Sequence, residues 1–228
     1  MKELIITLSA FILFILATMG QTPMGSAWDI DGNSYPLVKI GDQVWMAKNL
    51  DVSHFRNGDI IPEARTAEEW QKASDDTSPA WCYYKNDPVN GKHLGKLYNW
   101  YAVNDPRGLA PAGYHIPTDY EWVQLIDYLG GMKDAGYKMK STNGGWWEFG
   151  EEGNGNNESG FNALSGGWRS IQGEFDFLES DGCFWTSTTF NKYSYWDAWN
   201  YTINGGGDDV HKFHNDEGEG SSVRCIKN

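Results

Sequence analysis

The clearest hydrophobic pattern along the chain lies in residues 113–131. Four apolar residues there recur at spacings of three and four, as they do on one face of a helix. They are Trp122, Leu125, Ile126 and Leu129. Thr118 and Glu121 have the spacing of a capping box at the start of a helix, and Gly130 and Gly131 suit its end. The pattern predicts an amphipathic helix lying across a β-rich core.

Before this helix, the pattern predicts shorter elements. Alternation over Asp29–Asn49, interrupted at Gly41-Asp42, is typical of a β-hairpin, and Asp31-Gly32-Asn33 has turn chemistry. A second capping box, Thr66 with Glu69, opens a short helix. Trp81–Tyr84 is predicted to be a strand, and 86–92 a turn. The aromatic segment Leu97–Val103 fits a strand or a helix equally well by periodicity.

After Gly131 the chain changes character. Residues 141–160 are rich in Gly, Asn, Ser and Glu, which predicts a long loop, and loops of this length are often functional. Short strand candidates separated by glycine turns follow. They are Phe161–Leu164, Gly167–Ile171, Cys183–Thr189, Tyr195–Ile203, Val210–Phe213 and Val223–Ile226. The whole pattern predicts an α+β fold.

The N-terminal segment has the features of a signal peptide. Lys2 precedes an apolar run over Leu4–Ala17, and small residues follow near Gly20. An uncleaved anchor is the alternative, but the run is shorter than the ~20 residues that a membrane span requires. We therefore expect residues 1–20 to be removed, 21–27 to be a short linker, and 28–228 to form one domain that is secreted or held at the cell surface, without a membrane span.

Charge and composition narrow the range of partners. The net charge of −13 makes nucleic acid and anionic membrane poor partners. Aromatic residues make up 15% of the chain. Such a surplus either fills a core or provides exposed platforms that stack on sugars, and the count alone does not separate the two.

The tryptophans fall into two groups. Trp146 and Trp147 lie in the long polar loop, and Tyr195, Trp196 and Trp199 lie near a segment rich in Tyr and Asn. Flat aromatic faces with neighbouring amides suit sugar stacking and hydrogen bonding, so these five are the candidate ligand-binding residues, with a structural role as the alternative. Four others lie within predicted packed elements and are expected in the core: Trp100, Trp122, Trp168 and Trp185.

Evidence for metal binding or catalysis is weaker. Oxygen ligands of the kind calcium prefers occur at Asn154, Asn156, Asn157 and Glu158, but turn formation explains the same residues. No Gly-rich phosphate loop, HExxH or nucleophile elbow is present, nor a cysteine pattern with zinc spacing. No cofactor is expected beyond a possible structural calcium.

Several strings, in chain order, resemble the Fibrobacter succinogenes major paralogous domain. They are WCYYKNDPVNGK (81–92), GKLYNWYAVNDPRGLAPAGYHIPTDYEW (95–122), NESGFNALSGGWR (157–169), FWTSTT (184–189) and SSVRCIKN (221–228). IPTDYEW, Gly166-Gly167-Trp168 and the terminal Val-Arg-Cys are more distantly similar to the sulfatase-modifying-factor (formylglycine-generating enzyme) fold, a variant of the C-type-lectin-like domain. This resemblance implies small twisted antiparallel sheets, two or so helices and long loops, with the last strand beside the start of the chain.

The sequence departs from these families in informative places. Ala110 stands where family members often carry Cys, Cys183 where an aromatic residue is usual, and Ser221 where a large apolar residue is usual. The resemblance therefore implies a Cys183–Cys225 disulfide in place of one from position 110, with Cys82 a free buried thiol. The Cys pair of the formylglycine-generating enzymes is absent, and so is the sugar-binding Glu-Pro-Asn or Gln-Pro-Asp triplet of C-type lectins, although such folds often place calcium in the loop region.

Taken together, these observations predict a bacterial, non-catalytic binding module that recognises a glycan or a surface protein through aromatic-rich loops. A purely structural or adhesive surface component is the alternative. A formylglycine-generating-like oxidase is the third and least favoured hypothesis.

Overall fold

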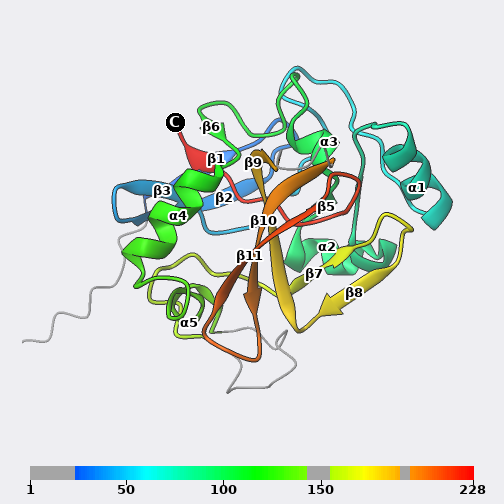
Figure 1. Cartoon of the computed structure of the whole chain (residues 1–228). Helices are drawn as coiled ribbons and strands as arrows, with labels where there is room; N and C mark the ends of the chain where they lie inside the picture. Colours follow the sequence, from blue (N-terminus) through cyan, green and yellow to red (C-terminus); the bar gives the residue numbers. More distant parts are fainter. Residues whose placement is uncertain (1–23, 143–154, 191–195) are drawn as a thin grey trace, which may run out of the picture.

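The computed structural model describes residues 24–142, 155–190 and 196–228. The predicted signal peptide lies outside these residues, as do the predicted site residues Trp146, Trp147, Asn154 and Tyr195. The described chain folds into two five-stranded sheets, a two-stranded ribbon and several short helices (Figure 1).

The first sheet joins the two ends of the described chain. Its strands, in spatial order, are β1 (Ser26–Trp28), β2 (Ser34–Ile40), β3 (Gln43–Met46), β12 (Ile226–Lys227) and β6 (Tyr114–His115). All neighbouring pairs are antiparallel, and Ile226 lies opposite Trp45. The predicted hairpin and the predicted return of the last strand to the start of the chain are therefore confirmed. β1 also takes in Ser26 and Ala27, which were assigned to the linker, because they pair with β2.

The second sheet comes from the later part of the chain. Its order is β11 (Val210–Asp216), β10 (Asp197–Asn204), β9 (Asp181–Phe190), β7 (Gly166–Arg169) and β8 (Phe175–Leu178). The pairs are antiparallel except for β7 with β9, which run parallel. β4 (Trp81–Cys82) and β5 (Leu97–Tyr98) form the ribbon. Phe161–Leu164 was wrongly predicted as a strand: only an isolated bridge at Ala163 is present there, and Asn162 has a φ of 56° that breaks an extended chain.

The helices are short. They are α1 (Ala67–Asp75), α2 (Pro88–Leu94), α3 (Trp100–Val103), α4 (Asp119–Tyr128) and α5 (Ala135–Met139), with a 3₁₀ turn η1 (Tyr84–Asn86). This is more helix than the two or so that were expected. The turn predicted at 86–92 is wrong, because Asp87 accepts the N–H of Val89 and Pro88 occupies the first turn, which together start α2. Leu97–Val103 divides into strand β5 and helix α3.

α4 is the predicted amphipathic helix. Thr118 and Glu121 form the expected capping box, and the corresponding box of Thr66 and Glu69 starts α1. The apolar face of α4 packs between the two sheets. It meets Trp45 of β3 on one side and Tyr201 of β10 on the other, where Trp122 stacks on Tyr201 with ring centroids 5.0 Å apart. The fold is thus a mixed α+β structure with an aromatic cluster around α4 between the sheets.

Arg224 connects residues near the end of the chain to two distant segments, 46–49 and 161–162. Its fully buried guanidinium donates to Asn49 Oδ1 at 2.8 Å and to the carbonyls of Met46, Phe161 and Asn162. Burial lowers the pKa of Arg224 to about 9, and no carboxylate pairs with it among the described residues. Neutral acceptors therefore compensate for the loss of its hydration.

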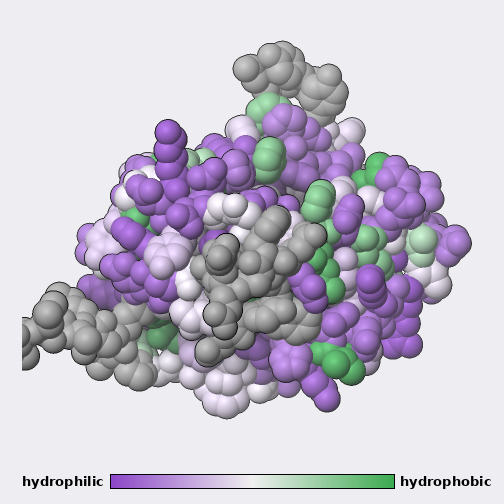
Figure 2. All heavy atoms as spheres, turned by 90° about the horizontal axis from the view of Figure 1, so that it is seen from below, coloured by the Kyte–Doolittle hydropathy of each residue, from purple (hydrophilic) through white to green (hydrophobic). Residues whose placement is uncertain are grey.

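The surface is mainly polar on the face seen from below. Figure 2 shows hydrophilic residues over most of that face, with apolar atoms in small separate patches. Within the described ranges, no helix has the length and apolar character needed to cross a bilayer.

Candidate functional site

The two faces of β10 have different surroundings. Tyr201 and Ile203 point into the core beside α4. Asn200 and Thr202, which alternate with them, lie on the other face of the sheet. Cross-strand pairing brings Cys183 of β9 and Phe213 of β11 to this second face, since Thr202 lies opposite Cys183 and Asn200 lies opposite Phe213.

This second face forms a hollow of about 310 Å³. Residues from all five strands of the sheet, together with Ser221, line it. They are Trp168, Phe177, Asp181, Cys183, Asn200, Thr202, Phe213, His214, Asn215 and Ser221. We call it the sheet hollow. It has aromatic side chains at its sides and small polar side chains beneath.

The floor of the sheet hollow is a connected polar network. Asn200 donates from Nδ2 to Ser221 Oγ at 3.0 Å, and the hydroxyl of Thr202 donates to Asn200 Oδ1 at 3.3 Å. All three side chains are buried. Their conformations are fixed by each other, so the floor presents amide and hydroxyl groups in a set arrangement.

Aromatic rings border the floor on two sides. Phe177 stacks on Trp168, with centroids 6.1 Å apart and planes 19° apart, while Phe213 is 50% exposed on β11. Phe177 has a φ of 62°, a conformation rarely adopted by bulky residues and often retained at functional sites. The Nε1 atom of Trp168 is buried without a hydrogen-bond partner among the described residues. Those of Trp70 and Trp122 share this state, but these two rings lie in packed core clusters, whereas the Trp168 ring borders the sheet hollow.

The wall that carries Trp168 is firmly anchored. Gly167 has a φ of 63°, and a Cβ there would lie 2.4 Å from the carbonyl oxygen of Asp176, so only glycine permits this close approach of β7 and β8. Arg169, fully buried, donates to the carbonyls of Ala64, Thr66 and Gly173. The position of Trp168 is therefore set by contacts to α1 and to its own hairpin.

The cysteines do not form the disulfide that the resemblance implied. Cys82, Cys183 and Cys225 are all free and buried. The reason lies in the register, because Ser222 is the residue beside Cys183: its N–H donates to the Cys183 carbonyl at 3.0 Å. Cys225 is three residues farther on, about 10 Å along an extended chain, beyond the usual Cα separation for a disulfide.

The Cys183 thiol has no sign of activation. Its sulfur lies 3.7 Å from the Thr202 hydroxyl oxygen, whose one hydrogen can go to either Cys183 or Asn200, and burial raises the pKa of the thiol to about 12. Burial has the same effect on Cys82 and Cys225. A thiol that stays protonated at neutral pH is a poor nucleophile, so Cys183 contributes shape and weak polarity to the hollow.

The predicted aromatic site is only partly described and does not coincide with the sheet hollow. Trp196 is 71% exposed. Trp199 is half-buried in a cluster on the opposite face of the sheet, 4.8 Å from the ring of Phe190, with Lys212 Nζ 3.8 Å above its ring. Among the tryptophans expected in the core, Trp100, Trp122 and Trp185 are buried there, but Trp168 is half-buried and borders the hollow.

Three of the four predicted calcium residues, Asn156, Asn157 and Glu158, take part in hydrogen bonds of a turn. Asn157 Oδ1 accepts the N–H of Asn162 at 2.8 Å, and Asn156 Oδ1 accepts the N–H of Glu158 at 3.0 Å. These are the acceptors that would otherwise face a cation. Across the described ranges, no group of three or more His, Cys, Asp or Glu side chains could hold a metal ion.

An acidic group lies beside the sheet hollow. Asn215 donates to Glu219 Oε2 at 2.6 Å. Burial, and then the nearby carboxylates of Asp216 and Asp197, raise the pKa of Glu219 to about 7. The carboxyl group that orients Asn215 therefore changes charge near neutral pH.

Comparisons with known proteins give one match. Neither the curated proteins nor the solved structures include a match to this chain. The sequence profile of the Fibrobacter succinogenes major domain family matches residues 38–227, which include all the strands and helices described here except β1 and the start of β2. The chain therefore belongs to the Fibrobacter succinogenes major domain family.

Proposed function

We propose that this protein is a non-catalytic binding module that recognises a glycan in the sheet hollow. The observation that carries the proposal is the combination of aromatic sides, at Trp168 with Phe177 and at Phe213, with a buried floor of Asn200, Thr202 and Ser221. A C-type-lectin-like relationship of the fold, and a secreted or cell-surface location, belong to the same proposal.

The chemistry of the lining favours a sugar. A sugar ring has apolar C–H faces and a rim of hydroxyl groups, so aromatic side chains cover the faces while amides and hydroxyls bond the rim. Such a site needs fixed polar groups, and the hydrogen bonds among Asn200, Thr202 and Ser221 supply that fixation. The volume of about 310 Å³ lies at the small end of ligand pockets and suits one or two sugar rings.

The departures from the family pattern support the same site. Cys183 stands where an aromatic residue is usual and Ser221 where a large apolar residue is usual, and both line the hollow. A larger side chain at either position would occupy space that is open in this chain. We infer that the sheet hollow depends on these two small residues.

Filling the hollow provides the sharpest test. A glycan array should give a specific signal with the wild type, and that signal should be lost with Ser221→Leu and with Cys183→Phe. Trp168→Ala and Phe213→Ala should each weaken it by about tenfold or more, the scale of losing a well-packed aromatic contact. Tyr120→Ala is the control, because Tyr120 is an exposed aromatic residue on α4 that does not line the hollow.

The alternatives give different results in the same experiment. An array without hits would refute the sugar site. If all four hollow variants keep the glycan signal and Trp196→Ala loses it, the site lies instead at the aromatic residues that the sequence predicts. A surface protein captured by wild type and not by the filled variants would keep the site but change the class of ligand.

A further inference from the structure

A second hollow lies around the turn between β1 and β2. It has a volume of about 260 Å³ and shares no residue with the sheet hollow. Its lining combines apolar side chains with a histidine and an arginine. The residues are Trp28, Asp29, Ile30, Val52, His54, Arg56, Leu109, Ala110, Pro111 and Ala112. We call it the Arg56 hollow.

Arg56 is held in place without being neutralised. Its Nε and Nη2 atoms donate to the carbonyl of Ala110 at 3.0 and 2.8 Å, and Nη2 also reaches the carbonyl of Tyr114 at 3.2 Å. Its backbone N–H donates to Gly108. No ion pair to Arg56 occurs within the described ranges, although the whole chain carries a net charge of −13. The guanidinium is therefore a rigid positive group with Nη1 available.

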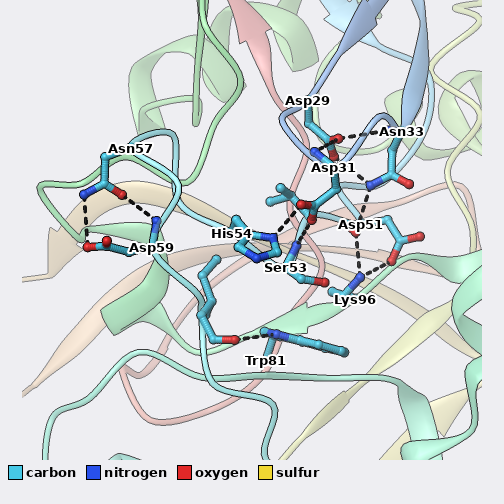
Figure 3. Close-up of polar contacts among 12 residues, drawn as sticks. Asp29, Asp31, Asn33, Asp51, Ser53, His54, Asn57, Asp59, Trp81 and Lys96 are labelled. Carbon is cyan, nitrogen blue, oxygen red and sulfur yellow. Dashed lines mark hydrogen bonds and ion pairs between the residues drawn. The ribbon is translucent and has the colours of Figure 1, made fainter.

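The acidic residues nearby are engaged in local structure. Asp29 accepts from four donors: the N–H groups of Asp31 and Asn33, the Asn33 amide and the Tyr35 hydroxyl. Asp31 accepts from Ser53 N–H and contacts His54 Nδ1 at 2.5 Å (Figure 3). In Figure 3 the Asp29 carboxylate faces Asn33 within the turn, and the Asp31 carboxylate faces Ser53 and His54. The Asp31 contact fixes the orientation of His54, which lines the Arg56 hollow through the rest of its ring.

The remaining wall is apolar and exposed. Trp28 is 64% exposed and Ile30 is 55% exposed, and Pro111 lies in the same lining. A flat indole face beside a fixed guanidinium can hold a molecule that has both a carboxylate and an apolar ring face. Arg56 can donate from Nη1 to one carboxylate oxygen, and this charge-assisted hydrogen bond is stronger than one between neutral groups.

We propose that the Arg56 hollow is a binding site for a carboxylate-bearing sugar, a uronic acid unit, whose carboxylate pairs with Arg56 and whose ring lies against Trp28. The site is separate from the sheet hollow, and its test does not depend on the outcome there.

Two sugars that differ only at the carboxylate test this directly. Methyl β-D-glucuronide and methyl β-D-glucoside would be titrated into the full mature domain, with the Trp28 indole N–H signal followed by NMR. We expect the glucuronide to bind at least tenfold more tightly. Arg56→Gln should reduce glucuronide affinity about tenfold, to the level of the glucoside, because one charge-assisted hydrogen bond is lost. Equal affinity of the two sugars for the wild type would overturn the proposal.

Variants separate this site from a general effect of charge or folding. Arg65→Gln is the matched control, because Arg65 is an exposed arginine paired with Glu63, and it should leave glucuronide affinity unchanged. Trp28→Ala removes an exposed side chain together with the indole signal, so its affinities are measured by titration calorimetry. Both sugars should bind more weakly while the far-UV spectrum stays the same. Ser221→Leu, which fills the sheet hollow, should have no effect.

A peptide arm tests the source of the carboxylate. A short apolar peptide with a free C-terminus and the same peptide amidated at that end would be titrated in parallel. Tighter binding of the free peptide than of the glucuronide, abolished by amidation and by Arg56→Gln, would overturn the assignment to a sugar.

Discussion

The two faces of the second sheet are packed differently around β10. On the side of Tyr201, aromatic rings from α4, β3 and β9 fill the space completely. On the side of Asn200, small polar residues form the floor of a hollow, and Trp185, which lies opposite Asn200, is buried in a separate core cluster. Neighbouring residues of one strand thus face a packed aromatic core on one side and the floor of a hollow on the other. The comparison suggests that stability is concentrated on the first face and recognition on the second.

The largest effect on stability is expected on the Tyr201 side of the second sheet. Trp122→Ala would remove a fully buried ring that contacts Trp45, Phe161, Phe184 and Tyr201. We expect a loss of about 4 kcal/mol in the free energy of unfolding, measured by urea denaturation. A loss below about 1 kcal/mol would mean that this face is not the core that the contacts indicate.

Arg224→Met is expected to lower the free energy of unfolding by about 3 kcal/mol. The substitution keeps much of the side-chain length but removes the donors to Asn49 and to the carbonyls of Met46, Phe161 and Asn162, which stay buried. Urea denaturation at pH 7 measures the change. Arg65→Met, on an exposed arginine, should leave the midpoint unchanged, and a similar loss there would point to charge in general.

Beside the sheet hollow, stability should depend on pH through Glu219. Its folded-state pKa, raised to about 7, exceeds the unfolded value, so the folded state binds the proton more tightly. The stabilisation from the neutral form is complete below about pH 4.5 and is lost as pH rises through 7. We expect the wild type to lose about 2 kcal/mol between pH 5 and pH 8.5, once partial exposure is allowed for.

Glu219→Gln should remove most of that pH dependence. The variant should melt at a higher temperature than the wild type at pH 8.5 and at a similar temperature at pH 5. Glu174→Gln is the control, since Glu174 is exposed on the neighbouring hairpin. Identical slopes of melting temperature against pH in wild type and Glu219→Gln would refute the role of this carboxyl group.

The smallest effect on stability, and the largest on binding, is expected in the floor of the sheet hollow. Ser221→Leu should lower the free energy of unfolding by about 1.5 kcal/mol, because the added atoms enter the hollow while the buried Asn200 amide loses its acceptor. It should also abolish glycan binding. A large destabilisation together with retained binding would reverse the distinction between the two faces. Paired measurements of unfolding and array signal on one preparation decide this.

Much of the framework could be predicted from the sequence. Both capping boxes, the amphipathic stripe of α4 and the β2–β3 hairpin follow from local patterns, and the structure confirms them. Local patterns failed where one residue decides the outcome. Asp87 with Pro88 starts a helix in a segment read as a turn, and Asn162 interrupts a segment read as a strand.

The sheet hollow could not be predicted in the same way. Trp168 was expected in the core because it lies in a predicted strand. The sequence of a strand does not show whether the face that carries a given side chain is covered by other elements. Asn200, Thr202 and Phe213 meet only through the register of β9, β10 and β11, which depends on residues far apart in sequence. The available signal was the small size of Cys183 and Ser221 at positions that are usually large. Their shared location becomes apparent only in three dimensions.

The position of β12 has a consequence for how the chain folds. Ile226 lies between Trp45 of β3 and His115 of β6, so an interior strand of the first sheet comes from residues 226–227. Contacts of such long sequence separation form slowly, because a large loop must close before they bring any stabilisation. The first sheet can therefore be completed only after residue 226 has been synthesised, and a protein cut short by a few residues at this end would lose its hydrogen bonds to both neighbouring strands at once.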